Sequence, residues 1–261
     1  MTAMIQSVIK AIELLELFSI QRPRMSLGEL ATVSGYPKTT IYTILKTLEA
    51  RGYVERVGED YALGSAVVSL SQASNVNVEI RDRAAPLLRE MADTLGESVY
   101  LTVPNGLHIL YIYAIESSQR LEARSAIGDN AYYHSTSVGK AVLAYLPAER
   151  LEQIIQEVGL PRRTVNTITT RDRLDNELAE IRSRGYSTDN SENEACTYCL
   201  GAPIFNSSPQ VVASCSVSGN SPAIIGDDLN RHVEVILRAA DAVSKRLGYV
   251  PNRSRIATSR V

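Results

Sequence analysis

Apolar residues near the start of the chain recur at the spacing of α-helices. A first helix is predicted over residues 5–18 and ends before Pro23; its apolar positions are Ile5, Val8, Ile9, Ile12 and Leu15. A second, short helix is predicted from Leu27, because Ser26 and Glu29 have the spacing of a capping box. Gly35 supplies the left-handed turn that ends this helix.

A third helix is predicted over residues 37–51, with apolar positions at Ile41, Ile44, Leu45 and Leu48. Pro37 fits its first turn, where a missing N–H leaves no bond unmade. The following run, YVERVGEDYALG, predicts two short strands around Gly58. This order is typical of a winged helix-turn-helix, in which the helix after the turn enters the major groove and the hairpin contacts backbone phosphate.

The other face of the third helix carries hydrogen-bond donors and cations. A solvated or protein-binding face could have the same composition, so the prediction of DNA contact depends on the capping box, the glycine turn and the wing beside it. Cations at the far end of the helix would reach phosphates, which gives salt-sensitive affinity without sequence preference. The residues predicted to bind DNA are Ser26, Lys38, Thr39, Thr40, Tyr42, Thr43, Lys46 and Arg51.

The remainder of the chain predicts a second domain built on hairpins. SVYLTV and HILYIYAI meet at Asn105-Gly106, a strong hairpin signal. Further strands are predicted at 119–125, 199–205 and 211–218, and helices at 79–95, 137–146, 148–157, 171–184 and 227–247. Paired strands with separate helices indicate an α+β fold with an antiparallel sheet. The predicted division is residues 1–64, a connecting helix over 65–78, a second domain over 79–250, and a flexible polar tail over 251–261.

Length and charge narrow this picture only slightly. A chain of 261 residues favours two domains, and a formal net charge of −2 does not mark a nucleic-acid partner. Residues 1–65 carry seven basic and seven acidic side chains, so any DNA contact depends on their placement. The start of the chain is interrupted by Lys10, Glu13 and Glu16, which excludes a signal peptide or a membrane span there. Three cysteines form no even disulfide framework, so a cytoplasmic protein without a membrane partner is expected.

Four stretches in this order resemble the IclR-type transcriptional regulators, and the resemblance runs from about residue 5 to 250. They are SLGELATVSGYPKTTIYTILKTLEARGYVER, YHSTSVGKAVLAYLP, RSRGYSTD and VVASCSVSG. The resemblance implies a winged helix-turn-helix, a linker helix and a GAF-like effector domain. It also implies a regulator, expected to be a repressor of a catabolic operon, that binds an operator in double-stranded DNA as a homodimer or a dimer of dimers. The implied effector is a small organic or aromatic acid or a derivative.

The resemblance also implies where the effector binds. It carries ligand-contact roles onto Ser137, Val138, Asp189, Cys199, Ser216 and Ser218. Glycine and alanine commonly stand at the first two of these positions, so the bulkier pair here is expected to reshape the pocket. From the residues alone, helix capping near Ser137 and a solvent-facing serine row would be the plainer interpretation. Asp189 would repel an anionic effector unless it is protonated or accepts from a ligand hydroxyl or amide.

Period two divides the strand VVASCSVSG into a polar and an apolar face. Val212, Ser214, Ser216 and Ser218 fall on one face, and Val211, Ala213, Cys215 and Val217 fall on the other. Tyrosines at positions 111, 113, 132 and 133 would add aromatic surface to a pocket, although tyrosines also fill half-exposed sheet faces.

A metal site and an enzyme are the alternatives to a regulator. Cys196 and Cys199 have the spacing of a zinc pair, with Cys215 and His134 as further ligands, but a second such pair is absent. No metal and no cofactor are predicted. A hydrolase using Cys199, His134 and Asp189 lacks a nucleophile-elbow pattern, so no catalytic residue is predicted and an enzyme is not expected. A protein-binding winged helix without DNA contact is the third alternative.

Overall fold

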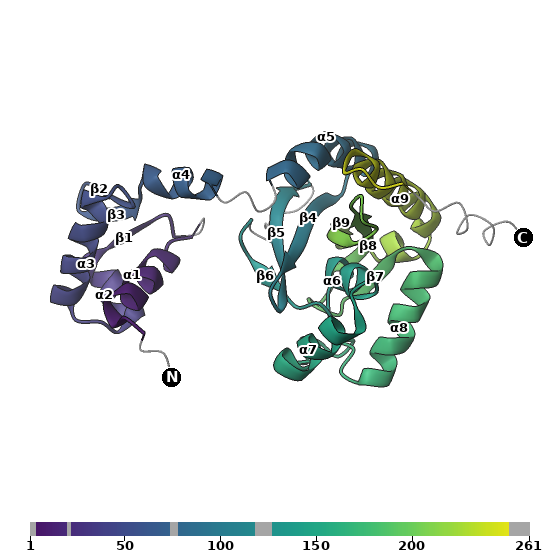
Figure 1. Ribbon diagram of the computed structural model, residues 1–261, viewed down its shortest axis with the longest axis horizontal. Coiled ribbons are helices and arrows are strands. Elements are labelled where there is room, and N and C mark those ends of the chain that lie inside the picture. Colours follow the sequence, from purple (N-terminus) through teal and green to yellow (C-terminus); the bar gives the residue numbers. More distant parts are fainter. Residues whose placement is uncertain (1–3, 20–21, 74–77, 118–126, 251–261) are drawn as a thin grey trace, which may run out of the picture. The chain divides into compact units, whose positions relative to one another are not determined.

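The computed structural model describes residues 4–19, 22–73, 78–117 and 127–250. The chain divides into two compact units, residues 1–76 and 77–261 (Figure 1). The strand predicted at 119–125 and the predicted tail at 251–261 lie outside the described residues.

Unit 1 is a winged helix-turn-helix followed by one further helix. Its strands form a three-stranded antiparallel sheet in the order β1-β3-β2. The strand β1 was not predicted, because its three residues carry no periodicity. The elements are α1 (Gln6–Glu16), β1 (Arg24–Ser26), α2 (Leu27–Ser34), α3 (Lys38–Ala50), β2 (Val54–Val57), β3 (Asp60–Leu63) and α4 (Ser65–Ala73).

The capping box predicted at the start of α2 is confirmed. Ser26 Oγ accepts from the backbone N–H of Glu29 at 3.2 Å, and Glu29 Oε2 accepts from the backbone N–H of Ser26 at 2.7 Å. Gly35 ends the helix in the left-handed region, with φ of 73°. The capping box fixes how the chain enters α2 from β1, and the left-handed Gly35 sets the turn from α2 toward α3.

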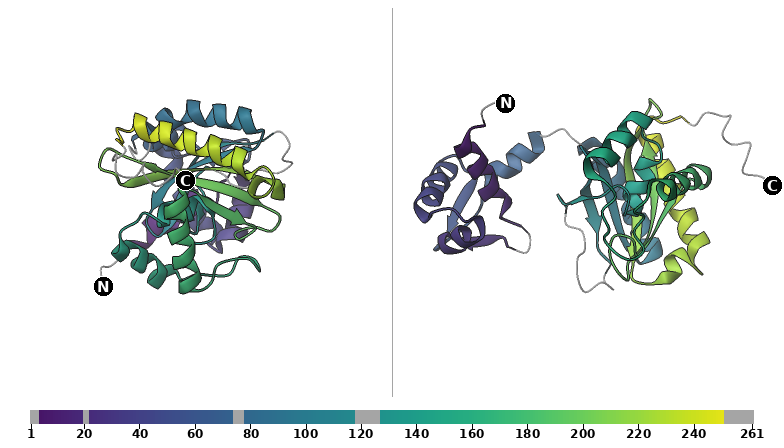
Figure 2. Two further views of the ribbon diagram at one scale, coloured as in Figure 1. Left: turned by 90° about the vertical axis from the view of Figure 1, so that its right-hand side faces the viewer. Right: turned by 90° about the horizontal axis from the view of Figure 1, so that it is seen from below.

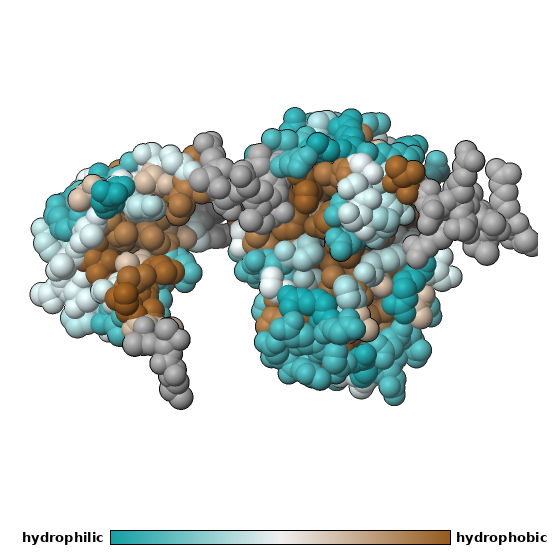
Figure 3. Space-filling model, viewed as in Figure 1, coloured by the Kyte–Doolittle hydropathy of each residue, from teal (hydrophilic) through white to brown (hydrophobic). Residues whose placement is uncertain are grey.

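The core of unit 1 is small, and α1 contributes Leu14 to it. The buried residues are Leu14, Phe18, Met25, Leu30, Ile41, Leu45, Val54 and Tyr61. The predicted first helix is confirmed, but three residues of its apolar stripe lie on the surface: Ile5, Val8 and Ile12 are 67%, 51% and 50% exposed. The core takes Leu14 from the other side of α1, which leaves this stripe on the surface. Figure 3 shows apolar residues gathered on the face of unit 1 around α1.

Unit 2 contains a six-stranded sheet in the order β6-β5-β4-β9-β8-β7, with all neighbours antiparallel. Its strands are β4 (Ser98–Asn105), β5 (His108–Ile115), β6 (Asn130–Ala131), β7 (Ser187–Asn190), β8 (Tyr198–Phe205) and β9 (Val211–Gly219). Its helices are α5 (Val78–Leu95), α6 (Ser137–Leu143), α7 (Ala148–Val158), α8 (Arg171–Arg184), α9 (Leu229–Arg246) and the 3₁₀ turn η1 (Pro222–Ile225). The predicted α+β class is confirmed, but β6, β7 and η1 were not predicted.

The sheet of unit 2 lies between two helical layers. Helices α5 and α9 cover one face, and α6 packs on the other with α7 and α8 beside it (Figure 2). The first interface is mainly apolar and includes Val99, Leu101, Leu200, Cys215 and Val217. Two polar side chains of α9, His232 and Ser244, are also buried. A register shift between Ile204 and Phe205 moves Val211 into the core cluster on the opposite face, so its predicted place beside Cys215 is wrong.

Two helix boundaries differ from the predicted ones. Helix α6 ends at Leu143, three residues before the predicted end at 146. The predicted linker helix over 65–78 is seen as α4 over Ser65–Ala73, after which α5 begins at Val78. Along the described residues, no helix is long and apolar enough to cross a membrane.

Candidate functional site

The strand register of unit 2 brings polar residues from distant parts of the chain into adjacent rows. Asp189 on β7 pairs with Cys199 on β8, and Cys199 pairs with Ser218 on β9. In the next row, Gly201 on β8 pairs with Ser216 on β9, which in turn pairs with Tyr100 on β4. Because directly paired residues share a face, all of these side-chain positions face α6.

Helix α6 is held on this face by hydroxyl groups. Ser187 Oγ donates to the carbonyl of Ser137 at 2.6 Å, and Ser214 Oγ donates to the carbonyl of Val138 at 2.9 Å. Gly201 permits this close approach, since a Cβ built there would lie 2.6 Å from the carbonyl carbon and oxygen of Ser137. The first turn of α6 therefore sits directly against β8.

A cavity of about 40 Å³ lies between α6, the sheet and the segment after β7. Five of the six predicted effector residues line it; the exception is Val138, whose side chain is 1% exposed and belongs to the core cluster under α6. Tyr100 and Tyr111 form one wall, with ring centroids 5.6 Å apart in an edge-to-face arrangement. The lining residues are Tyr100, Tyr111, Thr136, Ser137, Asp189, Asn193, Glu194, Thr197, Cys199, Ser216 and Ser218.

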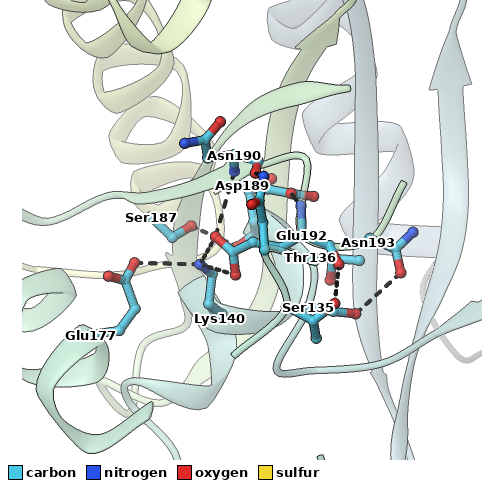
Figure 4. A network of polar contacts seen from close by, with 12 residues as sticks. Ser135, Thr136, Lys140, Glu177, Ser187, Asp189, Asn190, Glu192 and Asn193 are labelled. Carbon is cyan, nitrogen blue, oxygen red and sulfur yellow. Dashed lines mark hydrogen bonds and ion pairs between the residues drawn. The ribbon is translucent and has the colours of Figure 1, made fainter. Parts of the chain in front are cut away.

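A buried ion-pair network supports the opposite wall (Figure 4). Lys140 on α6 is completely buried, and its Nζ lies 2.6 and 2.8 Å from the two carboxylate oxygens of Glu192. The same Nζ lies 3.5 Å from Glu177 Oε1 on α8. Thr167 Oγ1 donates to the carbonyl of Glu192 at 2.7 Å, which helps to hold the loop between β7 and β8 in place.

Asp189 stands at the junction of this network and the cavity. Its side chain is 3% exposed, and its Oδ1 accepts from the backbone N–H of Glu192 at 2.7 Å. Burial, and secondly the charge of Glu192, raise the pKa of Asp189 to about 7. At the sheet side, Cys199 Sγ donates to Ser218 Oγ at 3.1 Å. The cavity therefore offers hydroxyl groups and a carboxyl group that changes its protonation state near neutral pH.

Among the described residues, Cys215 and His134 do not lie beside Cys199 and Asp189, so neither the alternative set of zinc ligands nor the alternative hydrolase triad comes together. Cys215 is on the far face of the sheet, where burial raises the pKa of its thiol to about 12. His134 does not line the cavity; its Nε2 contacts the carbonyl of Pro161 at 3.0 Å, and burial lowers its pKa. Within the described ranges, no three His, Cys, Asp or Glu side chains are placed to hold a metal ion.

The predicted DNA-binding residues of unit 1 lie along α3 and beside it. Ile41 and Leu45 are buried against α1 and α2, so the helix turns its polar side outward. Thr40 is half-buried, while Lys38, Thr39, Tyr42, Thr43, Lys46 and Arg51 are exposed. Ser26 is engaged in the capping box, where its hydroxyl also donates to Glu29 Oε2 at 2.8 Å.

Several cavity and network residues were missed at the level of sequence. Tyr100 was detectable, because period two along SVYLTV puts it on one polar face with Ser98 and Thr102. In the structure, Thr102 on that face bonds Ser214 at 2.7 Å. Asn193, Glu194 and Thr197 lie in a loop without periodicity and gave no signal. Lys140 gave a weak signal, since a cation inside the small and apolar run SVGKAVL is unusual for a solvated helix.

Sequence comparison places both units in one class of proteins. The model described as "Bacterial transcriptional regulator IclR C-terminal" matches residues 72–245, and "IclR helix-turn-helix domain" matches residues 7–58. The HTH-type transcriptional regulator XynR of Escherichia coli (strain K12) is 30% identical over 247 residues, which cover 94% of this chain and 98% of that protein.

Solved structures give the same result for the fold. The crystal structure of the Thermotoga maritima IclR has a TM-score of 0.80 and 31% sequence identity, covering 93% of this chain and 99% of that chain. An IclR homolog from Microbacterium hydrocarbonoxydans, complexed with 4-hydroxybenzoate, has a TM-score of 0.82 at 20% identity, covering 93% of this chain and 99% of that one. At that identity the second likeness bears on the fold alone.

Proposed function

Because the chain belongs to the IclR family of bacterial transcriptional regulators, we propose that α3 binds an operator and that a small acid in the cavity of unit 2 changes this binding. The observation that carries the proposal is the pairing of an exposed polar face on α3 with a polar cavity in a separate unit. A ligand can shift the equilibrium between two conformations of the protein only if it binds one of them more tightly than the other.

On the DNA side, the N-terminal turns of α3 would contact base edges. Lys38, Thr39 and Tyr42 are exposed there, with Thr40 and Thr43 beside them. In helix-turn-helix proteins the N-terminal residues of the second helix reach the bases of the major groove. Lys46, Arg51 and the helix start at Ser26 would contact phosphates, adding affinity that falls as salt rises.

We propose that the exposed stripe of α1 pairs two copies of the chain. Val8, Ile12 and Leu15 line an apolar groove of about 530 Å³, together with Ile44 and Leu48 of α3. An apolar surface of this kind on a soluble unit is typical of an interface. A symmetric pair would present two α3 helices to half-sites about one DNA turn apart. Two such dimers could associate further through unit 2.

On the ligand side, the effector would occupy the cavity lined by Ser137, Asp189, Cys199, Ser216 and Ser218. Val138 would contribute its backbone, since its side chain lies in the core. The cavity volume of about 40 Å³ favours a small aliphatic acid, and a ligand the size of 4-hydroxybenzoate would require the walls to move.

The remaining parts of the proposal follow from this division of roles. Residues 1–64 would bind DNA, residues 79–250 would bind the effector, and the connection at 65–78 would transmit the change between them. The protein would act in the cytoplasm, without catalytic turnover. We place it as a repressor of a catabolic operon, whose bound dimer blocks the promoter until the effector releases it.

The direct test is the double variant Thr39→Ala/Tyr42→Ala. A duplex selected by the wild-type protein from a random library serves as the operator in a mobility-shift assay. The variant is expected to bind it at least ~100-fold more weakly, because two base contacts are lost, with unfolding unchanged. Gln156→Ala, on the exposed face of α7, is the matched control and should bind normally. Unchanged binding by the double variant would rule out α3 as the recognition helix.

A further inference from the structure

The charges around the effector cavity are of one sign. Two carboxyl side chains, those of Asp189 and Glu194, line it, and no lysine or arginine does so within the described part of the chain. A carboxylate that entered such a site would meet like charges in a region of low dielectric, which is strongly unfavourable. An acid effector therefore needs another source of compensation.

Lys140 cannot supply that compensation directly. Its ammonium group is completely buried and is bonded to Glu192 on one side and near Glu177 on the other (Figure 4). Arg184 lies on Glu177, with 3.0 Å between Nη2 and Oε1. These two cations are thus already matched to two carboxylates. The charge of Lys140, which does not line the cavity, lowers the pKa of Asp189 less than burial and the charge of Glu192 raise it.

Asp189 is placed to supply the compensation through a proton. It lies in the same row as Cys199 and Ser218, and its carboxyl faces Lys140 of α6 and Glu192 and Glu194 of the following loop. Since the pKa of Asp189 is raised to about 7, mainly by burial, this carboxyl is available in its protonated form near neutral pH. A protonated carboxyl is a hydrogen-bond donor, whereas an ionised one only accepts.

We propose that Asp189 binds the effector's carboxylate through one shared proton, so that the protein senses an acid and the pH together. The inference rests on the proposed function and names the residue that selects its ligand. Hydrogen bonds between a carboxyl group and a carboxylate are short and strong. The hydroxyl groups of Ser216 and Ser218 would donate to the remaining oxygens of the acid. Each molecule bound to ionised Asp189 must then take up one proton from solution.

The size of the cavity selects the probes for a test. A volume of about 40 Å³ corresponds to roughly three water positions, which suits an acid of two or three carbons. Acetate, glycolate, lactate and pyruvate are therefore titrated into the full chain by calorimetry, with acetamide and lactamide as uncharged counterparts. The titrations are run at pH 6 and pH 8, in two buffers with different heats of ionisation.

One or more of the acids is expected to bind about tenfold more weakly at pH 8 than at pH 6. With the pKa of Asp189 at about 7, the protonated fraction falls from about 0.9 to about 0.1 over this interval, and the apparent Kd rises in proportion. The buffer dependence should show uptake of nearly one proton per acid bound at pH 8. The amides should bind no better than the acids at pH 6.

Asp189→Asn is the informative variant, because its amide donates hydrogen bonds at every pH. It should bind the same acid with equal affinity at pH 6 and pH 8, near the wild-type value at pH 6. Glu194→Gln is the matched control: it removes the other carboxyl of the lining and should leave the pH dependence in place. Without ligand, the infrared difference spectrum between wild type and Asp189→Asn should show the carbonyl stretch of a protonated carboxyl at pH 6.

The contrary outcomes separate this inference from the proposed function. Equal acid binding at both pH values, or loss of acid binding in Asp189→Asn, would overturn the shared proton and leave the regulator with an acid effector. Binding of amides in place of acids would show an ionised, accepting Asp189 and overturn it as well. Failure of every probe at both pH values, with operator binding intact, would remove the acid effector itself.

Discussion

The two units place their proposed recognition groups in opposite environments. On α3, Tyr42 is 46% exposed, and Thr39, Thr43 and Lys46 are exposed as well. In the cavity of unit 2, Asp189 and Ser218 are 3% and 4% exposed, and the side chain of each accepts a hydrogen bond from a neighbouring residue. Binding and folding are therefore separable in unit 1, whereas in unit 2 the residues that would recognise the ligand also hold the structure together.

The difference has its origin in the layers beneath each surface. The core of unit 1 is formed by residues such as Leu30, Ile41 and Leu45. The polar face of α3 is therefore not needed for the stability of the unit. In unit 2 the sheet is apolar toward α5 and α9, but toward α6 it is bonded by hydroxyl groups. Polar contacts there replace part of an apolar interface, and each unmatched group left behind would be costly.

The largest expected effect on stability comes from Lys140→Met, which tests whether the polar groups beside the cavity hold unit 2 together. The change leaves the carboxylate of Glu192 buried without its cation, which is expected to lower the free energy of unfolding by ~3–5 kcal/mol. Chemical denaturation measures the loss, and hydrogen exchange should locate it in unit 2. Lys140→Met/Glu192→Gln removes both charges and should recover part of it. A loss below ~1 kcal/mol for the single variant would contradict the role given to this pair.

The next largest effect is a pH dependence of stability at Asp189. The raised pKa means that the contribution of this group is fully present below its unfolded pKa of about 3.9 and is lost as pH rises toward about 7. Asp189→Asn carries no ionisable group at this position and avoids that loss. The stability of the variant relative to wild type should therefore increase between pH 4 and pH 8. The difference between the two pKa values sets an upper limit of ~4 kcal/mol. Denaturation curves at both pH values that shift equally for the two proteins would exclude a raised pKa.

The smallest effect belongs to unit 1. Ser26→Ala removes a capping hydroxyl and is expected to lower stability by ~1 kcal/mol, because one N–H of α2 loses its partner. Thr32→Ala is the control on the same helix, since its exposed hydroxyl bonds only the carbonyl of Gly28 and should be nearly neutral. If the two variants lose the same amount of stability, the capping box makes no measurable contribution to the stability of unit 1.

The sequence predicted the elements of both units because their signals are local. Periodicity placed α3 and α8 within a residue of their ends, and the box at Ser26 placed the start of α2. Alternation also put Ser214, Ser216 and Ser218 on one face of β9, where the structure has two of them lining the cavity. The stripe of α1 shows the limit of this reasoning, because periodicity identifies an apolar face without saying which layer covers it.

The rest of the candidate site depends on contacts between distant residues. Nothing near Lys140 in the sequence indicates that Glu192, 52 positions later, will lie against it. The strand β7 reads STDN, which is polar and carries turn-forming residues, so only its pairing with β8 makes it a strand. The bulge beside Phe205 likewise depends on the fit of β8 to β9. Such features arise from tertiary packing, which overrides local preference.

The alternation along β9 also limits how this kind of sensor can change its ligand in evolution. Its serines face α6 and the cavity, while Ala213, Cys215 and Val217 face the apolar layer. Deleting or inserting one residue in this strand would exchange the two sets, burying serines among methyl groups and emptying the binding face. Descendants of this chain can therefore adopt new effectors by substitution at every second position, but a single-codon insertion or deletion in the middle of β9 would abolish sensing and folding together.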